Sequence, residues 1–416
     1  MPTWNVSGAW NAHEEDFFES LRPAVSHLKL SASYSLTADR GPHYVTNSRV
    51  DIRSWNPWRP STSLKESALY IESLENSELT YEKKHELNIG AEIGFLDNRI
   101  NTTIDWYKRD NYDLIGIVNT QGVGGEVSKF GNVATMRSHG LELSISSTNI
   151  KTDDFTWKTN FVYSKIKNKI TRLDTKASVI DMVTGSGFAR EGYAVRSLFS
   201  IPFKGLNSEG LPTFLNQDGE ETIGDIYFQE RENIDFLEYS GSADPTDIGS
   251  LGNTFTYKGL KLNVFLTYSF GNVVRLDPVF SSSYSDLAAL PREFKNRWAV
   301  PGDEKVTNVP VLPTKRQASN LGYGMGIAYN AYNYSTERIA KGDFVRMKEI
   351  SLSYDFPNTL ARKLGVNKLS ARIQATNLFL LYSDDKLNGQ DPEFFNSGGV
   401  AAPVPKQFTF TLKLGL

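Results

Sequence analysis

The chain has 416 residues, no cysteine, 45 basic and 48 acidic residues, and a hydrophobic fraction of 39%. Without cysteine it has no disulfide framework, thiolate metal site or cysteine nucleophile, and its near-neutral charge provides no bulk attraction to nucleic acid. Mean hydropathy is −0.37, and no apolar run approaches the ~18 residues that a membrane-spanning helix needs. Transmembrane β-strands are compatible with these values, because such strands expose only every second residue to lipid.

Alternation of apolar and polar residues with a period of two is the dominant pattern. Between His85 and Phe95 the apolar residues occupy every second position. Turn-forming residues follow at 96–99, and the alternation resumes from Ile100 to Trp106. The pattern predicts a β-hairpin with one apolar and one polar face. Similar runs recur at residues 141–145, 155–163, 255–270, 350–356, 369–375 and 408–416.

Long polar segments separate roughly a dozen predicted strands, many of them near the ~10 residues of a tilted transmembrane strand. These segments cover residues 37–80, 174–191, 212–247 and 277–336. Such long loops are unusual in a compact soluble domain, whereas short turns alternating with long extracellular loops are typical of outer-membrane barrels. Helical patterns are limited to residues 11–21 and 358–364. The predicted fold is therefore all-β, an antiparallel transmembrane β-barrel with long extracellular loops.

Residues for catalysis or for metal and cofactor binding do not form a recognisable motif. Gly185–Gly187 lacks the strand-to-helix context of a nucleophile elbow, and Gly122–Gly125 lacks a dinucleotide fingerprint. The histidines are not spaced as metal ligands. They are His13, His27, His43, His85 and His139. We therefore predict no catalytic, cofactor-binding or metal site, and we do not expect an enzyme.

Acidic clusters provide the nearest approach to a metal site. Glu14–Asp16 is interpreted as a solvated turn or helix start. Asp384–Asp385 and Asp391–Glu393 lie in one loop, and clustered carboxylates are the ligands that Ca²⁺ prefers. Their spacing matches no EF-hand, so a solvated loop is the favoured interpretation.

Aromatic residues fall into two groups. One group lies in the long loops, where exposed rings stack on sugars or contact a partner, or else pack within the loops; the sequence leaves both readings open. Its members are Trp55, Trp58, Tyr70, Tyr323, Tyr329, Tyr332 and Tyr334. The other group lies in predicted strands and is interpreted as interfacial girdle residues. It comprises Trp106, Tyr107, Trp157 and Tyr163.

Ordered motifs along nearly the whole chain resemble one protein family. The segment Trp10–Phe17 resembles the W-x-x-x-E-E-x-F segment of SusC/RagA-type TonB-dependent outer-membrane transporters, and residues 28–34 resemble the strand that follows it. Asn207 stands where the family usually has aspartate. Further residues resemble family motifs in the expected order. They are Glu86, Asn88 and Gly90; Arg99, Asp105 and Tyr107; Asn132, Gly140 and Glu142; Gly192, Tyr193, Gly205 and Gly210; Tyr257–Gly259 and Gly271–Asn272; Gly342–Lys348; Asn377–Phe379; and Asp391–Glu393.

This resemblance implies a function in nutrient uptake across the outer membrane of a Gram-negative, Bacteroidetes-like cell. A complete family member imports a bulky nutrient, a glycan or a peptide. A SusD-like surface lipoprotein covers its extracellular face, and the TonB–ExbB–ExbD machinery supplies energy through the N-terminal region. Outer-membrane lipid surrounds the barrel. The resemblance assigns no substrate-binding residue.

The resemblance covers the C-terminal part of the family's barrel only. Residues 1–416 are accordingly interpreted as this portion, without counterparts of the plug domain and N-terminal region. Met1–Trp4 lacks the basic and apolar regions of a signal peptide, and Leu416 stands where such barrels usually end in an aromatic residue. Plugged transporters use 22 strands, which roughly a dozen strands cannot replace. We therefore expect a fragment or one half of a split protein.

Two other interpretations make different structural predictions. A soluble β-rich protein that binds or cleaves glycans would pack its apolar strand faces into a closed core and form a compact groove. A porin-like channel would be closed by this chain alone. The transporter interpretation predicts one outward apolar belt, with the polar strand faces turned toward a lumen.

Overall fold

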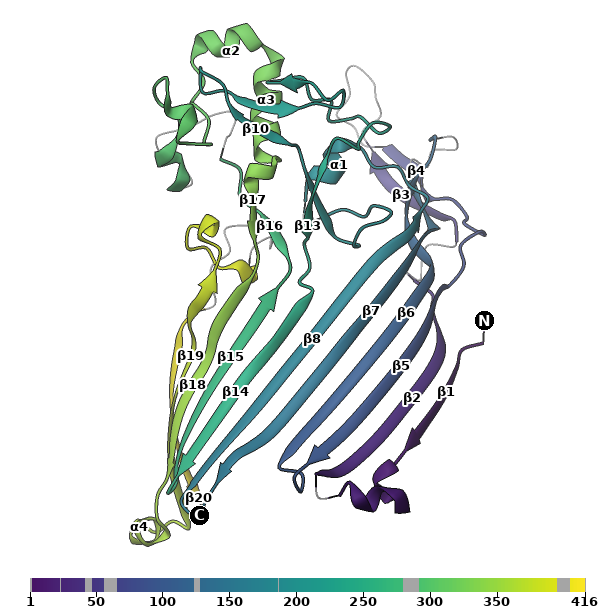
Figure 1. The fold of residues 1–416 in the computed structure, drawn as a ribbon. Coiled ribbons are helices and arrows are strands. Elements are labelled where there is room, and N and C mark those ends of the chain that lie inside the picture. Colours follow the sequence, from purple (N-terminus) through teal and green to yellow (C-terminus); the bar gives the residue numbers. More distant parts are fainter. Residues whose placement is uncertain are drawn as a thin grey trace.

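A computed structural model describes residues 2–22, 24–41, 47–55, 66–122, 128–185, 187–279, 292–394 and 405–415. Its largest element is an eleven-stranded sheet in the order β1-β2-β5-β6-β7-β8-β14-β15-β18-β19-β20, which Figure 1 shows as a row of long tilted strands. Each neighbouring pair is antiparallel. The all-β antiparallel prediction is thus confirmed. The strands are β1 (Trp4–Trp10), β2 (Val25–Asp39), β5 (Glu82–Phe95), β6 (Ile100–Asn119), β7 (Ser128–Lys151), β8 (Phe155–Leu173), β14 (Asp247–Tyr257), β15 (Leu260–Phe270), β18 (Phe344–Asp355), β19 (Lys368–Ser383) and β20 (Gln407–Gly415).

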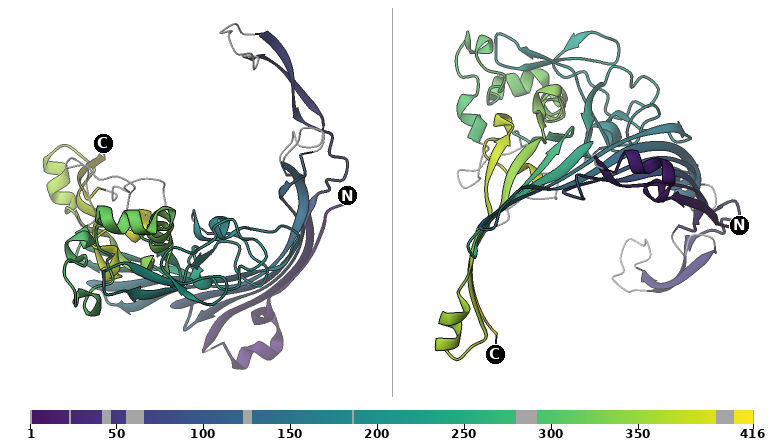
Figure 2. Two further views of the ribbon diagram at one scale, coloured as in Figure 1. Left: turned by 90° about the horizontal axis from the view of Figure 1, so that it is seen from above. Right: turned by 60° about the horizontal axis from the view of Figure 1, so that its bottom comes forward.

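The sheet bends into an open wall. Seen from above in Figure 2, it forms an arc, with the N-terminal and C-terminal strands at opposite ends. Among the described residues, β1 pairs only with β2 and β20 only with β19. Each end of the wall therefore presents one unpaired strand edge.

The long connections between strands all lie at one end of the wall, together with the shorter connection 120–127, and the other end carries only connections of 14 residues or fewer. Residues 11–24, 96–99, 152–154, 258–259 and 356–367 connect strands at one end. Residues 40–81, 120–127, 174–246, 271–343 and 384–406 connect them at the other. This arrangement is that of an outer-membrane barrel, with short turns on one side and long loops on the other.

Two short turns show how the local sequence reverses the chain. In the turn between β5 and β6, Leu96, Asp97 and Asn98 all have positive φ angles, a conformation that Asp and Asn tolerate. Between β14 and β15, Lys258 and Gly259 have φ angles of 45° and 86°. Positive φ at both central residues is the signature of the type I′ turn, whose twist matches the twist of the flanking strands.

The long loops carry their own secondary structure. The described parts of residues 174–246 and 271–343 fold together into a unit that we call the loop lobe, which Figure 2 shows on the concave side of the wall. Its buried core includes Phe199, Phe214, Met325 and Tyr332. Its elements are α1 (Val179–Val183), β9 (Ser197–Ser200), β10 (Phe203–Leu206), β11 (Pro212–Leu215), β12 (Glu221–Thr222), β13 (Glu238–Ser242), β16 (Val273–Arg275), η3 (Arg292–Asn296), η4 (Asp303–Lys305), α2 (Lys315–Leu321), α3 (Tyr323–Asn333), η5 (Thr336–Arg338) and β17 (Ile339–Lys341).

Smaller elements complete the structure. A hairpin of β3 (Arg49–Trp55) and β4 (Glu66–Ser73) extends from the loop between β2 and β5. The predicted helical segments are present as η1 (Ala12–Glu14), η2 (Asp16–Ser20) and α4 (Asn358–Lys363). The C-terminal loop contains η6 (Asp385–Leu387) and η7 (Pro392–Phe394). Across the described ranges, every helix is too short or too polar to cross a bilayer.

Candidate functional site

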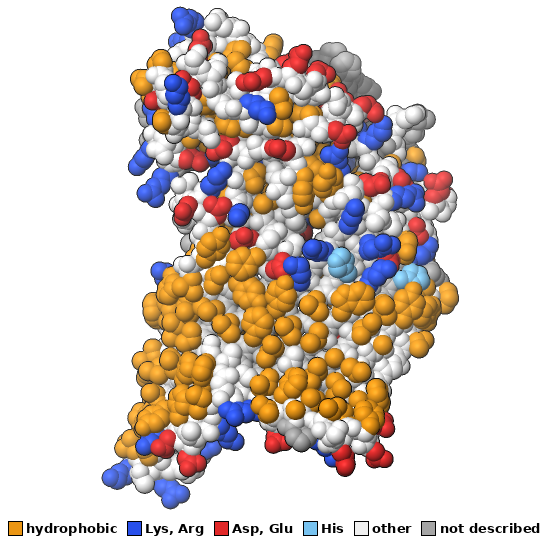
Figure 3. Space-filling model, viewed as in Figure 1, with side chains coloured by type: hydrophobic (Ala, Val, Ile, Leu, Met, Phe, Trp, Pro, Cys, Tyr) orange, Lys and Arg blue, Asp and Glu red, His pale blue; other side chains and the backbone are white. Residues whose placement is uncertain are grey.

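The convex face of the wall carries a continuous apolar belt. Cross-strand register aligns Ile89 with Trp106 and Trp106 with Leu141, and the series continues around the sheet with Leu352 opposite Ile373. Figure 3 shows the belt crossing the strands, with charged side chains beyond both of its edges. Exposed members of the belt include Val6, Leu30, Ile89, Trp106, Leu141, Leu352, Ile373, Phe408, Phe410, Leu412 and Leu414.

Aromatic rings line both edges of this belt. Near the short turns, Trp157 stacks on Phe255 with ring centroids 5.6 Å apart. Near the long loops, Trp4 meets Tyr34 edge to face at 5.4 Å, and the Tyr34 hydroxyl hydrogen-bonds to His85. Rings with an apolar body and a polar tip favour the level of lipid headgroups. An uncovered belt with such edges is a lipid-facing surface, whereas a soluble monomer rarely exposes an apolar patch of more than several hundred Å².

The concave face of the same strands is polar. Glu86 lies between Lys84 and Arg109, with nitrogen–oxygen distances of 2.7 and 3.0 Å. On an adjoining strand, Lys29 contacts Glu92 at 2.7 Å. We call this surface the lumen wall. Each of these two carboxylates is paired with at least one cation, so this part of the wall offers hydrogen-bonding groups on a locally balanced surface.

A second polar network occupies the C-terminal half of the lumen wall. Glu349 accepts hydrogen bonds from Arg372 at 2.7 Å, from Ser351 at 3.0 Å and from Gln374 at 3.2 Å. Asn263 on β15 reaches the same carboxylate at 3.4 Å. The network joins three strands on one face, which fixes these side chains relative to one another.

Tyr107 belongs to the lumen wall, so the prediction that it is a girdle residue is wrong. It is buried on the concave face, where the Arg109 guanidinium lies 4.0 Å from its ring centroid. A Cβ added to Gly140 on β7 would lie 2.4 Å from the ring. The ring therefore covers the glycine, in the way that an aromatic residue compensates for glycine in a strand. The other three predicted girdle residues, Trp106, Trp157 and Tyr163, lie on the convex face.

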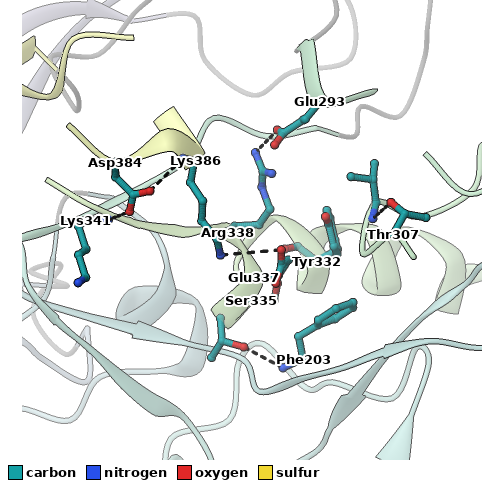
Figure 4. Close-up of polar contacts among 12 residues, drawn as sticks. Phe203, Glu293, Thr307, Tyr332, Ser335, Glu337, Arg338, Lys341, Asp384 and Lys386 are labelled. Carbon is teal, nitrogen blue, oxygen red and sulfur yellow. Dashed lines mark hydrogen bonds and ion pairs between the residues drawn. The ribbon is translucent and has the colours of Figure 1, made fainter. Parts of the chain in front are cut away.

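Two buried arginines hold the loop lobe together. Arg275 donates to the carbonyl of Phe199 at 2.6 Å and to the Ser200 hydroxyl at 3.1 Å, and burial lowers its pKa to about 10. Arg338 forms an ion pair with Glu293 at 2.6 Å (Figure 4). Buried charges are tolerated only with such partners, so these contacts join parts of the lobe that lie far apart in the sequence.

A third buried arginine ties the C-terminal loop to the wall. Arg346 on β18 forms an ion pair with Asp391, and its Nε lies 3.1 Å from Glu393. Nearby, Asp384 accepts a hydrogen bond from the backbone N–H of Lys341 at 2.8 Å (Figure 4). The favoured reading of these carboxylates as a solvated loop is therefore wrong for Asp391, which is buried. Within the described residues, no three His, Asp or Glu side chains form a group that could hold a metal ion.

The aromatic residues predicted in the long loops lie in different environments. Tyr329 and Tyr332 are core residues of the loop lobe, and burial raises the pKa of Tyr332. Tyr323 is almost fully exposed, and its proposed contact with a sugar or partner stays a prediction. Trp58 and the side chains of Trp55 and Tyr70 lie outside the described residues.

Histidines and acidic residues near the N-terminus also have defined places. The rings of His13 and His27 lie with centroids 4.1 Å apart and planes tilted by 50°, and His85 and His139 lie on the convex face. His43 lies outside the described residues. The segment Glu14–Asp16 forms the predicted turn, with Glu15 accepting a hydrogen bond from the Trp10 indole at 2.9 Å.

Sequence reasoning missed Arg275, Arg338 and Glu293, which organise the loop lobe. Each lies in a segment without periodicity, and their partners are 45 to 76 residues away in the chain. The only available signal was the high density of aromatic residues around 323–334, which indicates a packed loop but not its ion pairs.

No family model matches the chain. It is 26% identical to a TonB-dependent receptor of Formosa agariphila, over 95% of this chain and 40% of the relative. It is also 26% identical to the TonB-dependent receptor SusC of Bacteroides thetaiotaomicron, over 98% of this chain and 39% of the relative. The structure of the RagAB peptide transporter superposes with a TM-score of 0.77 and 22% identity, covering 99% of this chain and 43% of the other. The chain is a relative of the SusC-type TonB-dependent receptors.

The structure of the chain agrees with that relationship. Its eleven-stranded wall has the fold of an outer-membrane β-barrel wall, and the relatives that it matches are outer-membrane receptors, so the lipid-facing belt lies in the outer membrane. The chain spans about two-fifths of the length of the curated relatives it matches.

Several of the motif residues fix the local structure of the loops. The Asn132 amide on β7 donates to the carbonyls of Thr80 and Asp113, at 2.9 and 2.6 Å, and so joins the 40–81 loop to the irregular part of strand β6. Asn207 accepts hydrogen bonds from two backbone N–H groups, so the asparagine closes its turn as an aspartate would. Both asparagines therefore stabilise backbone segments near them, and neither role involves a substrate.

Proposed function

We propose that the chain forms the C-terminal portion, residues 1–416, of the barrel of a nutrient importer, and that the plug domain and N-terminal strands belong to another part of the same protein. The observation that carries the proposal is the two-faced wall with unpaired edges at β1 and β20. In lipid, each unsatisfied backbone group costs several kcal/mol. Eleven strands are half of the 22 that plugged transporters use, so a further set of strands would pair both edges.

In this proposal the lumen wall and the loop lobe line the path of a bulky nutrient, a peptide or a glycan. Paired charges such as Glu86–Arg109 and the Glu349 network offer donors and acceptors on a balanced surface. Such a surface suits a neutral or zwitterionic polar substrate better than a highly charged one. The similarity to the RagAB peptide transporter supports a peptide. A glycan stays the alternative substrate.

The proposed partners follow from the same relationship. A SusD-like surface lipoprotein would cover the end that bears the loop lobe, because the long loops lie at the extracellular end of such barrels. TonB–ExbB–ExbD would couple through the N-terminal region. The loop lobe has a packed core of its own, so it provides a preformed surface rather than a set of free loops.

The experiment is an uptake assay in the native cell. The coding region is deleted and then restored, and uptake of a labelled peptide mixture and of a labelled oligosaccharide mixture is compared with and without an uncoupler of proton-motive force. We expect uptake of one mixture to be lost on deletion, restored on complementation and abolished by the uncoupler. Unchanged uptake of both mixtures, or uptake that is insensitive to the uncoupler, would contradict the proposal.

Location and partner are tested in the same strain. The protein should fractionate with the outer membrane and require detergent for extraction, and a surface lipoprotein should co-purify with it. A protein recovered in the soluble fraction would instead support the glycan-binding alternative.

A further inference from the structure

A cluster of basic side chains lies on the convex face of β6, β7 and β8, directly beyond the apolar belt on the side of the long loops. Lys108 is in register with His139, and His139 with Lys167. One row further, Arg137 is in register with Lys169. These residues continue the every-second-residue series of the belt, so they share its outward face. Figure 3 shows blue and pale blue side chains along this edge.

Acidic residues neutralise only part of this cluster. Asp110 contacts Arg137 at 2.6 Å and Lys108 at 3.5 Å, so one carboxylate serves two cations. Lys165, which is in register with Leu141 of the belt, contacts Asp247 at 2.9 Å.

The remaining two lysines provide the excess charge. Lys167 and Lys169 are exposed, and neither forms an ion pair within the part of the chain that the structure describes. We define the basic cluster as Lys108, Arg137, Lys165, Lys167 and Lys169. With two carboxylates among them, these five side chains leave an excess of three positive charges on a surface that faces away from the lumen.

The belt beside the cluster is hollowed. Small residues Gly8, Ala32 and Ala91 leave a depression of about 680 Å³, bounded by the larger side chains of Trp10 and Trp106. On β6, Lys108 follows Trp106 by two residues on the same face. A single elongated molecule could therefore occupy the hollow and reach the basic cluster at the edge of the belt.

We propose that the basic cluster binds the phosphate groups of an anionic lipid of the outer leaflet, with an acyl chain of that lipid in the belt hollow. The level of the cluster fits a headgroup, because it lies where the apolar belt ends and on the extracellular side of the barrel. Each basic residue near an anionic membrane surface contributes about 1 kcal/mol to its attraction. The inference depends on the membrane location of the chain and is independent of the imported substrate.

The ligand test uses the protein extracted from its outer membrane in detergent. The probes are a bis-phosphorylated glycolipid, the same glycolipid after enzymatic dephosphorylation, and inorganic phosphate. Binding is measured by native mass spectrometry of the micelle-released protein and by competition. We expect the phosphorylated glycolipid to bind more tightly than either other probe. Equal binding of the dephosphorylated lipid would overturn the phosphate assignment, and equal binding of inorganic phosphate would overturn the lipid assignment.

Variants locate the site. Replacing Lys167 and Lys169 together by glutamine should weaken binding of the phosphorylated glycolipid about thirtyfold, since two contributions of about 1 kcal/mol are lost. The matched control replaces the exposed Lys295 and Lys305 of the loop lobe by glutamine, which removes the same charge and should leave binding unchanged. Arginine at 167 and 169 should retain binding. Equal binding by the glutamine pair and the control pair would overturn the proposal.

Filling the hollow provides an independent test. Ala91→Leu should weaken binding of the intact glycolipid several-fold, because the added side chain occupies the space of the acyl chain, and should leave competition by inorganic phosphate unchanged. Only protein that is correctly inserted, judged by heat-modifiable electrophoretic mobility, is compared. A protein that never reaches the membrane would count against the proposed function, whereas inserted protein with unaltered lipid binding counts against this inference alone.

Discussion

Placing an arginine on either face of strand β7 tests whether the convex face of the wall lies in lipid or in water. Ile145 is on the convex face, in register with Thr102 and Phe161, near the middle of the belt. Its neighbour Ser144 is on the concave face and exposed. An arginine at mid-bilayer depth on the lipid face of a barrel costs about 2–4 kcal/mol, and on the lumen face it costs little. We therefore expect Ile145→Arg to lower the free energy of unfolding by about 3 kcal/mol and Ser144→Arg to change it by less than about 1 kcal/mol.

The measurement is equilibrium unfolding in urea of the membrane protein in phospholipid vesicles, followed by tryptophan fluorescence and by heat-modifiable mobility. The two variants carry the same added charge on adjacent residues, so each is the control for the other. If Ser144→Arg cost as much as Ile145→Arg, or if Ile145→Arg cost nothing, the assignment of the convex face to lipid would be refuted.

Three further predictions concern local contacts. Gly140→Ala should lower the free energy of unfolding by about 1–3 kcal/mol, because the new Cβ would collide with the Tyr107 ring. Adding Tyr107→Ala to this variant should recover part of that loss. If urea titrations showed that the two changes in unfolding free energy simply add, the contact would be contradicted. Arg346→Met should lower the stability of the C-terminal loop by about 3–5 kcal/mol, because it leaves the Asp391 carboxylate buried and unpaired. The double variant with Arg346→Met and Asp391→Asn should lose less stability. Equal losses in the two variants, measured by limited proteolysis of the C-terminal loop, would refute this pairing. A hydrogen bond from the Trp298 indole to Glu304 lowers the pKa of that carboxyl below its ordinary value. The stabilisation from this contact is fully present well above the ordinary pKa of a glutamate and is lost as pH falls through the lowered pKa. Glu304→Gln should remove this acid transition from the tryptophan fluorescence, and an unchanged transition in the variant would argue against it.

Much of the wall could be predicted from the sequence, because the face on which a strand residue lies follows from the alternation of its immediate neighbours. In the segment 87–95, every second residue is apolar, and the structure places those residues on the convex face. The strands at 255–270 and 369–375 follow the same rule. Polar turns such as Lys258–Gly259 carry their own conformational signal. Alternation thus indicates which face meets lipid, because each residue is apolar or polar according to whether its own side chain meets lipid or water.

The loop lobe could not be predicted in the same way. Helix α3 (Tyr323–Asn333) contains two glycines and no clear period of 3.6, and its stability depends on the core that Tyr332 enters. Arg275 finds its carbonyl partner on Phe199, far away in sequence. Tyr107 was assigned to the wrong environment because an aromatic residue in a strand fits a girdle equally well. Only the register that puts Gly140 beside it shows its true role.

The most direct test of the central claim uses the absence of cysteine in the chain. Single cysteines are introduced in turn at residues 371–375 of β19, and outer membranes are treated with a water-soluble maleimide and, separately, with a lipid-soluble one. The two-faced wall predicts that cysteines replacing Arg372 and Gln374 react with the water-soluble reagent, whereas those replacing Ala371, Ile373 and Ala375 react only with the lipid-soluble reagent. Equal reaction of all five positions with the water-soluble reagent would contradict a membrane-spanning wall.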